Sequence, residues 1–575
     1  MSAELQAALC RVAETTLAAV SSLDTARLPE GFCAGLTGTM TVDGHGLEVA
    51  VRIPDAFPRS LPAVFVVGGL PFPIPHIEKS GRVCSAVEQG LVIDRRNPAG
   101  VIAWALEAAR RTISDGLNRR NSQDFIEEFG SYWLRSDERH WAYSAVNPND
   151  RQRQVMVLER GNAQTGGLMP VAFFDDRAGR QVIEARLKAK DLAPRFGVYI
   201  PLTPRGSFIP PQGGQTWTFG EWRELIKASL LRADRRNLKR LLKKSGADAP
   251  VVVGLAKHGG GRTLVAFKPR AHDKTHPLAD QSEQTPVPIQ LERWDKEYLL
   301  PRGGASNALL GKKVAIVGCG AVGGHIAEML AASGVGHLTL VDPDTMSNDN
   351  TFRHFLGKTL VGERKASALE IDIRWRFPYI DMQSFNDDIM ALIQANTLSF
   401  AAFDLIILAT GEPTLELELN ERLRRLPKAP PAIHTWVEPL GIGGHAVLTV
   451  RAKQGCLECL FTSPDDEDAP MYNQASFAGP NQEFTRDLAG CGGAFTPFSY
   501  LDGLRTAETA ARLAIGSLRG AIQESRLTSW RGESAEFLRA GFQLSPRWSV
   551  TDDKLTVTGE VFRQSDCPVC AARLD

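Results

Sequence analysis

The sequence predicts a multidomain α/β protein whose C-terminal part is a doubly wound sheet of parallel strands. Three observations support this fold class. A chain of 575 residues is long enough for several domains. Residues 314–317 form an apolar, β-branched run that a glycine-rich turn joins to an amphipathic helical pattern and a second strand at 337–341. No uncharged apolar run reaches the roughly 18 residues of a membrane span.

Charge and cysteine content narrow the class of protein. Lys plus Arg equals Asp plus Glu at 66 residues each, so no overall basic excess points to nucleic acid. Glu4 and Glu14 lie within the first helical pattern, which does not match a signal peptide. The nine cysteines include two C-x-x-C pairs and suit a reducing compartment better than a disulfide scaffold. We therefore expect a cytoplasmic protein.

Three predicted regions follow one another along the chain. Residues 1–145 have the pattern of an α+β domain, and residues 146–300 that of an α/β connecting domain with a basic helix over 222–244. Residues 301–575 hold the βαβ unit and further strands at 405–409 and 432–436. The elements expected in the first region are a helix over 4–22, strands over 38–42, 47–53 and 63–67, and helices over 100–115 and 123–134.

A glycine-rich turn directly after the strand at 314–317 is the strongest motif of the third region. In Gly318-Cys-Gly320-Ala-Val-Gly323, the glycines permit a tight turn and the close approach of a phosphate. The helix that follows offers free N–H groups to the same phosphate. Because any dinucleotide enzyme could carry this turn, the residues after the second strand decide which nucleotide it suits.

Acidic, amide and basic side chains follow the second strand at fixed offsets. One acid at the strand end suits a ribose hydroxyl pair, whereas Arg353 and Lys365 can match the charges of a triphosphate. A solvated polar loop on a dehydrogenase is the plainer interpretation. The pattern D-x-D-x-x-S-x-x-N-x-x-R, then V-G-x-x-K-A, resembles the adenylating domain of the ThiF/MoeB and ubiquitin-activating enzyme family. The resemblance implies a Rossmann-like domain in which Asp344, backed by Asp342, holds ribose while Asn350, Arg353 and Lys365 surround the ATP phosphates.

Two C-x-x-C pairs in the third region predict a structural zinc site. The pairs are Cys456 with Cys459 and Cys567 with Cys570. Four thiolates satisfy tetrahedral zinc and leave no open position for catalysis. The metal would join the C-terminal segment to the body of the adenylating domain, and the resembled family commonly has this arrangement. A redox pair is the alternative for either C-x-x-C alone.

Cys491 is the candidate nucleophile of the third region. It stands between glycines and shortly before a long helical pattern over 501–518. Glycines let a substrate backbone approach, and a nearby helix N-terminus lowers a thiol pKa. The functional interpretation is a thiol that takes an acyl group from an acyl-adenylate, and the plainer one is a small thiol packed among glycines. Members of the resembled family carry a catalytic cysteine after the nucleotide core.

Cys84 is the candidate nucleophile of the first region. A helix, an antiparallel meander, a proline-rich loop and the motif H-x-x-x-x-G-x-x-C resemble a ubiquitin-conjugating enzyme, which carries an acyl group as a thioester on this cysteine. The usual His-Pro-Asn triplet is absent, because Ile77 and Glu78 follow His76. The oxyanion-stabilising Asn of that family therefore has no clear counterpart, and His76 is a candidate for orienting the loop. A loop cysteine without chemistry is the alternative.

The order of the two modules resembles the CD-NTase-associated fused enzymes of bacterial antiphage (CBASS) operons. That family implies a CD-NTase, activated at its C-terminus, as the acyl donor, with ATP and Mg²⁺ as cofactors and a homodimer as the assembly. The family's Mg²⁺-binding Asp is replaced by Gly411-Glu412, so Glu412, or phosphates and water alone, would hold the metal. The arginine that the family contributes across a dimer could be Arg293 or Arg302.

The combined pattern predicts a three-step transfer. ATP adenylates a protein C-terminal carboxylate at the Gly318 loop, Cys491 takes the acyl group, and Cys84 receives it for transfer to an amine such as a target lysine. The resemblance implies that the acyl donor is a CD-NTase, and the sequence leaves a ubiquitin-like protein open as the alternative donor. Two alternatives remain: a sulfur-carrier adenylyltransferase, which leaves residues 1–145 without a function, and a nucleotide-sensing scaffold without catalysis.

Overall fold

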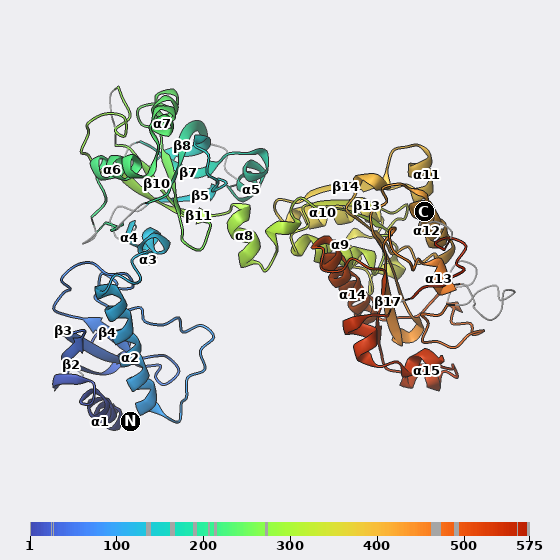
Figure 1. The fold of residues 1–575 in the computed structure, drawn as a ribbon, viewed down its shortest axis with the longest axis horizontal. Helices are drawn as coiled ribbons and strands as arrows, with labels where there is room; N and C mark the ends of the chain where they lie inside the picture. Colours follow the sequence, from blue (N-terminus) through green and yellow to red (C-terminus); the bar gives the residue numbers. More distant parts are fainter. Residues whose placement is uncertain are drawn as a thin grey trace. The chain divides into compact units, whose positions relative to one another are not determined.

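The chain forms two compact units, Met1–Asp295 and Lys296–Asp575 (Figure 1). The computed structural model describes residues 2–24, 26, 28–133, 140–161, 167–187, 192–204, 208–211, 215–270, 274–461, 473–487, 494–560 and 562–571. No described helix is long and apolar enough to cross a lipid bilayer. The division of the first unit at residue 145 stays a prediction.

The first unit begins with a four-stranded antiparallel meander. Its elements are α1 (Ser2–Ala13), β1 (Leu17–Ser22), β2 (Phe32–Val42), β3 (His45–Pro54), β4 (Ala63–Val66) and α2 (Pro98–Leu117). Leu36, Val51 and Val64 are opposite one another on three strands and point to one face, where α1 and α2 pack. This alternation of buried and solvent-facing positions is what a half-buried sheet requires.

The helix expected over 4–22 is wrong in its second half. It ends at Ala13, and residues Leu17–Ser22 form β1, which pairs with β2. Pairing with β2 satisfies the backbone groups of this edge strand and places Leu17 opposite Met40 in the core. Tertiary pairing thus overrides the local helical pattern.

Two short helices replace the single helix expected over 123–134. They are α3 (Asp124–Glu127) and α4 (Phe129–Trp133). Phe129 and Trp133 pack into an aromatic cluster with Trp222 and Phe267 of the domain that follows. The Trp133 indole N–H donates to the Ala266 carbonyl over 3.0 Å. α3 and α4 are therefore fastened to the next domain.

That domain is a closed β-barrel with flanking helices. The strand order is β10-β11-β5-β7-β6-β8-β9, in which β11 pairs in parallel with β5. The bounds are β5 (His140–Ala145), β6 (Arg153–Gly161), β7 (Leu168–Phe174), α5 (Arg177–Leu187), β8 (Ala193–Leu202), α6 (Phe219–Ser229), α7 (Arg232–Ser245), β9 (Val251–Ala256), β10 (Arg262–Lys268) and β11 (Val287–Arg293).

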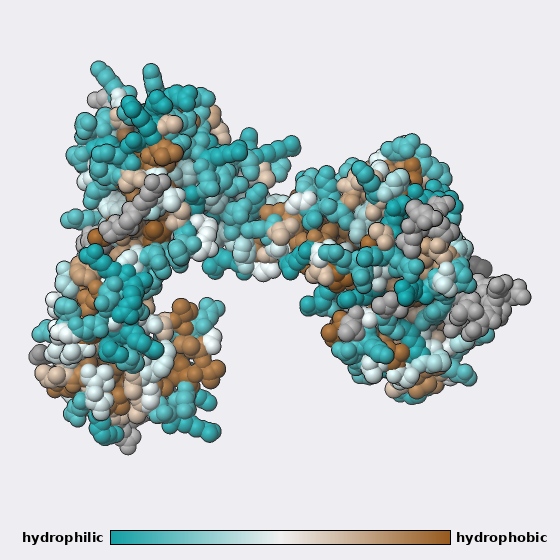
Figure 2. All heavy atoms as spheres, viewed as in Figure 1, coloured by the Kyte–Doolittle hydropathy of each residue, from teal (hydrophilic) through white to brown (hydrophobic). Residues whose placement is uncertain are grey.

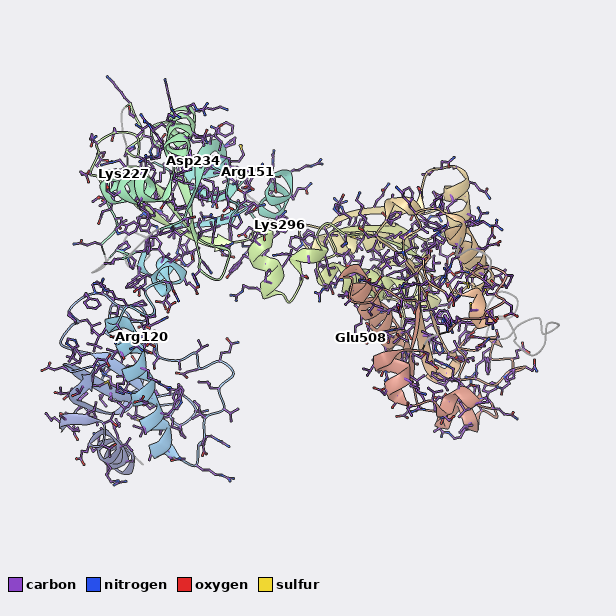
Figure 3. The ribbon with its side chains drawn as sticks, viewed as in Figure 1. Arg120, Arg151, Lys227, Asp234, Lys296 and Glu508 are labelled. Carbon is purple, nitrogen blue, oxygen red and sulfur yellow. The ribbon has the colours of Figure 1, made fainter. Side chains whose placement is uncertain are left out.

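The basic helix expected over 222–244 is two helices. Lys227 lies on α6 and Asp234 on α7 (Figure 3). Leu230 between them has extended backbone, with φ −108° and ψ 141°, and its side chain packs against the aromatic cluster. The sequence contains no Gly or Pro at this point, so no residue type marks the break between the two helices.

The second unit is built on a seven-stranded sheet in the order β14-β13-β12-β15-β16-β17-β20. The first five strands are parallel and the last two antiparallel, which gives the doubly wound, Rossmann-like arrangement that the sequence predicts. The bounds are β12 (Lys313–Val317), β13 (His337–Val341), β14 (Asp381–Phe385), β15 (Leu405–Leu408), β16 (Ala432–Val437), β17 (Gly443–Thr449) and β20 (Arg526–Arg531).

Helices cover both faces of this sheet, so its central strands are apolar throughout. On β12, Val314 and Ile316 pack on one side while Ala315 and Val317 pack on the other. The larger helices are α9 (Gly323–Ala332), α10 (Lys365–Arg376), α12 (Pro413–Arg425) and α14 (Tyr500–Leu518). The shorter elements are α8 (Lys296–Arg302), α11 (Ile389–Gln394), α13 (Glu458–Phe461), α15 (Ala535–Arg539) and the pair β18 (Arg486–Asp487) and β19 (Ala494–Phe495).

Candidate functional site

The glycine turn after β12 forms a cradle that side chains would block. Gly318 has φ +88°, and a Cβ there would lie 2.4 Å from the Ala409 carbonyl oxygen. A Cβ on Gly323 would lie 1.8 Å from the Gly318 carbonyl oxygen. A Cβ on Gly320 would meet no atom within 4 Å, so the backbone faces open space there. The first and last glycines thus permit the turn, and the middle one leaves room for a ligand.

Asp342, at the end of β13, holds this cradle rather than facing a ligand. Its two carboxylate oxygens accept from the backbone N–H of Cys319 over 2.6 Å and of Asp344 over 2.8 Å. Burial raises the pKa of Asp342, and both hydrogen bonds oppose that shift. With both oxygens engaged, Asp342 orders the loop, and Asp344 is the acid exposed to solvent.

Lys365 is paired with Asp344 at the start of α10. Its Nζ lies 2.7 Å from Asp344 Oδ2, and its backbone N–H donates to the Asp344 carbonyl. The lysine side chain is buried whereas that of Asp344 is 64% exposed. The structure therefore brings together the predicted ribose and phosphate ligands Asp344 and Lys365.

Asn350 and Arg353 lie in the segment between these two residues. Asn350 Oδ1 accepts from the backbone N–H and the hydroxyl of Ser347, which orders the turn. The Arg353 guanidinium stands 5.4 Å from the ring centre of Phe498. His354, which the sequence analysis missed, donates from Nε2 to the Cys319 carbonyl over 2.7 Å and accepts at Nδ1 from the Leu356 N–H. Burial lowers the pKa of His354 to about 4, so this neutral histidine joins the Arg353 segment to the cradle.

The turn after β15 is organised by Glu416, a residue that no sequence motif marked. Glu416 Oε1 accepts from the backbone N–H and the hydroxyl of Thr410, and its Oε2 lies 3.1 Å from His434 Nδ1. Gly411 has φ +74°, and Glu412 is exposed at the N-cap of α12. Because Glu416 is engaged, Glu412 is the carboxylate of this turn that faces solvent.

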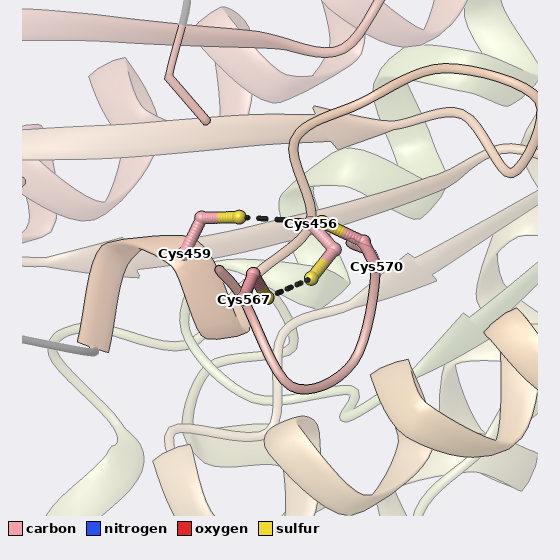
Figure 4. A group of neighbouring side chains, drawn as sticks. All are labelled: Cys456, Cys459, Cys567 and Cys570. Carbon is pink, nitrogen blue, oxygen red and sulfur yellow. Dashed lines mark hydrogen bonds between the residues drawn. The ribbon is translucent and has the colours of Figure 1, made fainter. Parts of the chain in front are cut away.

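The four predicted zinc ligands converge on one point (Figure 4). Their sulfurs all lie within 4.8 Å of one another, with Cys456 to Cys567 at 3.7 Å and Cys459 to Cys570 at 3.5 Å. Zinc–sulfur bonds of about 2.3 Å in a tetrahedron need sulfurs about 3.8 Å apart. All four side chains are buried, so the donor set fits a closed, structural zinc ion. Asn420 Oδ1 supports the first pair by accepting from the Leu457 N–H.

The two predicted nucleophiles differ in what the structure describes. Cys491 lies outside the described residues, between β18 and β19. Cys84 is exposed and follows a short hairpin that extends the sheet beyond β4. Val83 donates to the Val64 carbonyl, and Cys84 donates to the His76 carbonyl over 2.8 Å. A Cβ on Gly81 would lie 2.2 Å from the Val66 carbonyl, so this glycine permits the close approach.

Desolvation of the sulfur and a neighbouring carboxylate both act on the thiol of Cys84. Its Sγ donates to Glu78 Oε1 over 3.4 Å. Loss of solvent around the sulfur, followed by the hydrogen bond and charge of Glu78, raises the pKa of Cys84 to about 11. The thiol is therefore protonated at neutral pH, and a base is needed to make it a nucleophile.

His76 is clamped between two carboxylates. Its Nδ1 lies 2.7 Å from Glu128 Oε1, its Nε2 lies 2.9 Å from Asp124 Oδ2, and its backbone N–H donates to Glu128 Oε2. The hydrogen bond to Glu128 contributes most to raising the pKa of His76 to about 9. The residue has φ +64°, a conformation that a non-glycine residue needs such contacts to keep. Because Asp124 and Glu128 lie on or beside α3, a sequence separation near 50 residues concealed this clamp.

Comparisons with protein families separate the part of the chain that carries Cys84 from the part that carries the glycine cradle. The ThiF family model matches residues 298–517, and the model of prokaryotic E2 family B matches residues 34–141. The ATP-dependent ubiquitin transferase-like protein Cap2 of Pseudomonas aeruginosa is 24% identical over 78% of this chain and 81% of that protein. Cap2 of Escherichia coli is 23% identical over 90% of this chain and 89% of that protein. This chain is therefore similar over most of its length to proteins named Cap2, and it matches an E2 family model in its N-terminal part and the ThiF family model in its C-terminal part.

The fused organisation confirms the resemblance inferred from the motifs. An adenylating domain and an E2-like domain in one chain make it an enzyme of the adenylating, ubiquitin transferase-like class. Among solved structures, E. coli MccB with ATP is 18% identical over 46% of this chain and 68% of its own, with a TM-score of 0.32.

Proposed function

We propose that this fused protein activates the C-terminal carboxylate of a protein with ATP and transfers it, through thioesters, to an amine. The observation that carries the proposal is the presence, in one chain, of a glycine cradle with a Lys365–Asp344 pair and of an exposed Cys84 in an E2-like domain. An acyl-adenylate needs an acceptor thiol, and covalent linkage of the two domains raises the local concentration of that acceptor.

In the first step, the ThiF domain binds ATP and the carboxylate. The Gly318–Gly323 backbone and the N-terminus of α9 receive the phosphates, and Asp344 receives the ribose hydroxyls. Lys365, released from Asp344, and Arg353 counter the charge that develops on the leaving pyrophosphate. Glu412 is the residue of the neighbouring turn that would hold Mg²⁺, which supplies further charge neutralisation.

In the later steps, we assign Cys491 as the first acyl acceptor and Cys84 as the second. The Cys84 sulfur, after a base removes its proton, attacks the acyl carbon of the Cys491 thioester, and the Cys491 sulfur leaves and is reprotonated. A lysine amine then attacks the Cys84 thioester. The donor is a CD-NTase or a ubiquitin-like protein, and the cytoplasm is where such a donor would be met. Val87 and Val92, which follow Cys84 in the chain, are 78% and 99% exposed. Figure 2 shows hydrophobic side chains gathered on the surface of this domain, as expected of a surface that binds a protein partner.

A homodimer of the ThiF domain completes the proposal. Ile371 and Trp375 lie one helical turn apart on α10 and are 71% and 80% exposed, and Phe352 is also exposed. Such apolar surface suits contact with a second copy of the chain. Arg302 is exposed in the same unit as the cradle, whereas Arg293 is paired with Asp295 in the barrel. We therefore prefer Arg302 as the arginine contributed across the dimer.

Non-reducing electrophoresis with ATP, Mg²⁺ and a candidate CD-NTase or ubiquitin-like protein tests the relay. We expect thiol-sensitive adducts that Cys491→Ala abolishes and that Cys84→Ala reduces to one adduct, at Cys491. Cys33→Ala is the matched control, because Cys33 is a half-buried thiol outside the proposed relay. A double mutant that still forms a thiol-sensitive adduct would refute the cysteine assignment. ATP binding without any pyrophosphate exchange would instead favour the non-catalytic scaffold.

A further inference from the structure

Glu78 stands two residues after His76, where the His-Pro-Asn triplet of the resembled conjugating enzymes has its asparagine, and its carboxylate contacts Cys84. Its Oε1 accepts from Cys84 Sγ over 3.4 Å, and its Oε2 accepts from the Ser80 hydroxyl over 3.3 Å. Its backbone N–H donates to the Arg82 carbonyl, which closes the hairpin. The carboxylate is therefore held against the sulfur by its own loop.

An ionised carboxylate cannot do what an asparagine amide does. It only accepts hydrogen bonds, so it has no donor for the oxyanion that forms when a thioester is attacked. Its negative charge favours a cation or a proton at this point. Desolvation of the sulfur and the Glu78 carboxylate together keep the Cys84 thiol protonated at neutral pH. The residue at this position is thus suited to moving protons.

We propose that Glu78 is the general base of the conjugation site. It accepts the proton of the amine that attacks the Cys84 thioester and passes that proton to the sulfur. The inference rests on the proposed function, because it concerns the step in which Cys84 releases the acyl group.

The step balances without another reactant. The amine nitrogen forms a bond to the thioester carbonyl carbon while Glu78 takes the proton from the nitrogen. The carbon–sulfur bond then breaks, its electron pair leaves with Cys84 Sγ, and the proton moves from Glu78 to that sulfur. The products are an amide and a thiol. After this transfer the protonated Sγ would donate a hydrogen bond to Glu78 Oε1, which is the hydrogen bond present in the structure.

The cavity at Cys84 is suited to an amine. It has a volume of about 320 Å³, and Glu78 and Glu128 both line it. Glu128 is engaged by His76, whereas Glu78 contacts the reacting sulfur directly. Lys79 also lines the cavity, and Arg82 acts on Cys84 through its charge, so the carboxylates are partly balanced. A lysine side chain that enters would meet Glu78 next to the thioester.

Discharge of a preloaded thioester tests this assignment. The full-length chain carrying Cys491→Ala is acylated at Cys84 by exchange with a small-molecule thioester of a glycine-ending peptide, and peptide mapping verifies the site. Free lysine is then added and loss of the adduct is followed by mass spectrometry. We expect Glu78→Gln to slow discharge about 100-fold or more, the range of general base catalysis. Glu78→Asp keeps the carboxylate, so its discharge rate should lie between those of the wild type and Glu78→Gln.

Two comparisons make the result decisive. Glu88→Gln removes an exposed carboxylate from the same loop and should leave discharge unchanged. Hydroxylamine, a weakly basic nucleophile, should discharge wild-type and Glu78→Gln thioesters at similar rates. The base assignment would be overturned if lysine discharged the wild-type and Glu78→Gln thioesters at equal rates. It would also be overturned if Glu78→Gln slowed discharge by lysine and by hydroxylamine to the same extent. Because loading needs no ATP, the experiment can fail or succeed separately from ATP-dependent activation, which the electrophoresis of the wild-type chain tests.

Discussion

Lys365 illustrates how one residue links the fold to the proposed chemistry. It begins α10, is buried, and lies 2.7 Å from Asp344, so a single ion pair joins the residue proposed to bind the phosphates to the residue proposed to bind ribose. ATP would have to separate this pair, because each partner would take up a different part of the nucleotide. The cost of separation is offset by the new charge-assisted hydrogen bonds.

Lys365→Ala should therefore abolish most adenylation without unfolding the domain. Loss of one charge that stabilises the transition state typically lowers a rate about 100- to 1,000-fold, and we expect ATP–pyrophosphate exchange to fall in that range. Lys358→Ala, at an exposed lysine seven residues earlier, is the control. Exchange that survives Lys365→Ala at the wild-type rate would remove Lys365 from the site.

His76 makes a pH-dependent contribution to the stability of the Cys84 loop. The pKa of His76 is raised from an ordinary 6.5 to about 9 by Glu128 and Asp124. A raised histidine pKa contributes stability that is fully present below pH 6.5 and is lost as pH rises through 9. Hydrogen exchange of the backbone at residues 74–84 should therefore accelerate between about pH 6.5 and 9.

His76→Gln should remove this pH dependence from the loop. The exposed His45 on β3 belongs to the same domain, and His45→Gln should leave the dependence in place. The comparison isolates the clamp from general effects of pH on exchange chemistry. The clamp would be contradicted if hydrogen exchange of this loop in the wild type, corrected for the effect of pH on exchange chemistry, did not change with pH.

At the scale of elements, the helices α3 and α4 are fastened by aromatic packing. Phe129 is fully buried, with ring centres of Trp217 at 5.1 Å and Trp222 at 6.1 Å. Truncation of such a side chain typically costs about 3–5 kcal/mol. Phe129→Ala should reduce the stability of the first unit by that amount in denaturant unfolding, whereas Trp141→Ala, at a residue 60% exposed, should change it little. Equal effects would show that the cluster does not anchor these helices.

The two C-x-x-C elements should bind about one zinc ion per chain. Cys456→Ser or Cys567→Ser should abolish zinc in elemental analysis and lower the melting temperature of the second unit, because four buried thiols lose the metal that joins them. Cys10→Ser changes a half-buried thiol of the first unit and should keep the full zinc content. A full zinc content in Cys567→Ser would mean that the metal is elsewhere.

At the scale of the whole molecule, the relay should depend on having both cysteines in one assembly. A mixture of full-length Cys84→Ala and Cys491→Ala proteins restores both thiols, but on different chains. If transfer occurs within a chain, the mixture should form conjugate slowly, and its rate per molecule should rise with protein concentration. The rate per molecule of the wild type should not depend on protein concentration. A mixture that matches the wild type at low concentration would indicate transfer across a stable dimer.

Sequence reasoning predicted those parts whose chemistry is local. The glycine turn, the residues from Asp342 to Lys365 and the zinc pairs lie in short motifs, and the structure brings Asp344 to Lys365 and the four sulfurs together. The barrel was not predicted, because its closure pairs β11 with β5 across some 150 residues and no short pattern signals such a pairing. Glu416 and Glu128 were missed for the same reason, since their partners lie in other elements.

The segment formed by α3 and α4 has two contacts of opposite physical character. Aromatic rings hold it to the barrel. Salts that are excluded from protein surfaces, such as sulfate, strengthen apolar contacts of this kind. Toward Cys84 it is held by the charges of Asp124 and Glu128 on His76, an attachment that ionic strength screens. Raising the concentration of sulfate should therefore strengthen the apolar contact with the barrel while it screens the charged contact with His76. We therefore expect α3 and α4 to stay attached to the barrel at high sulfate concentration, while their contact with the loop that carries Cys84 weakens. The composition of the solvent would then decide which of the two contacts breaks first.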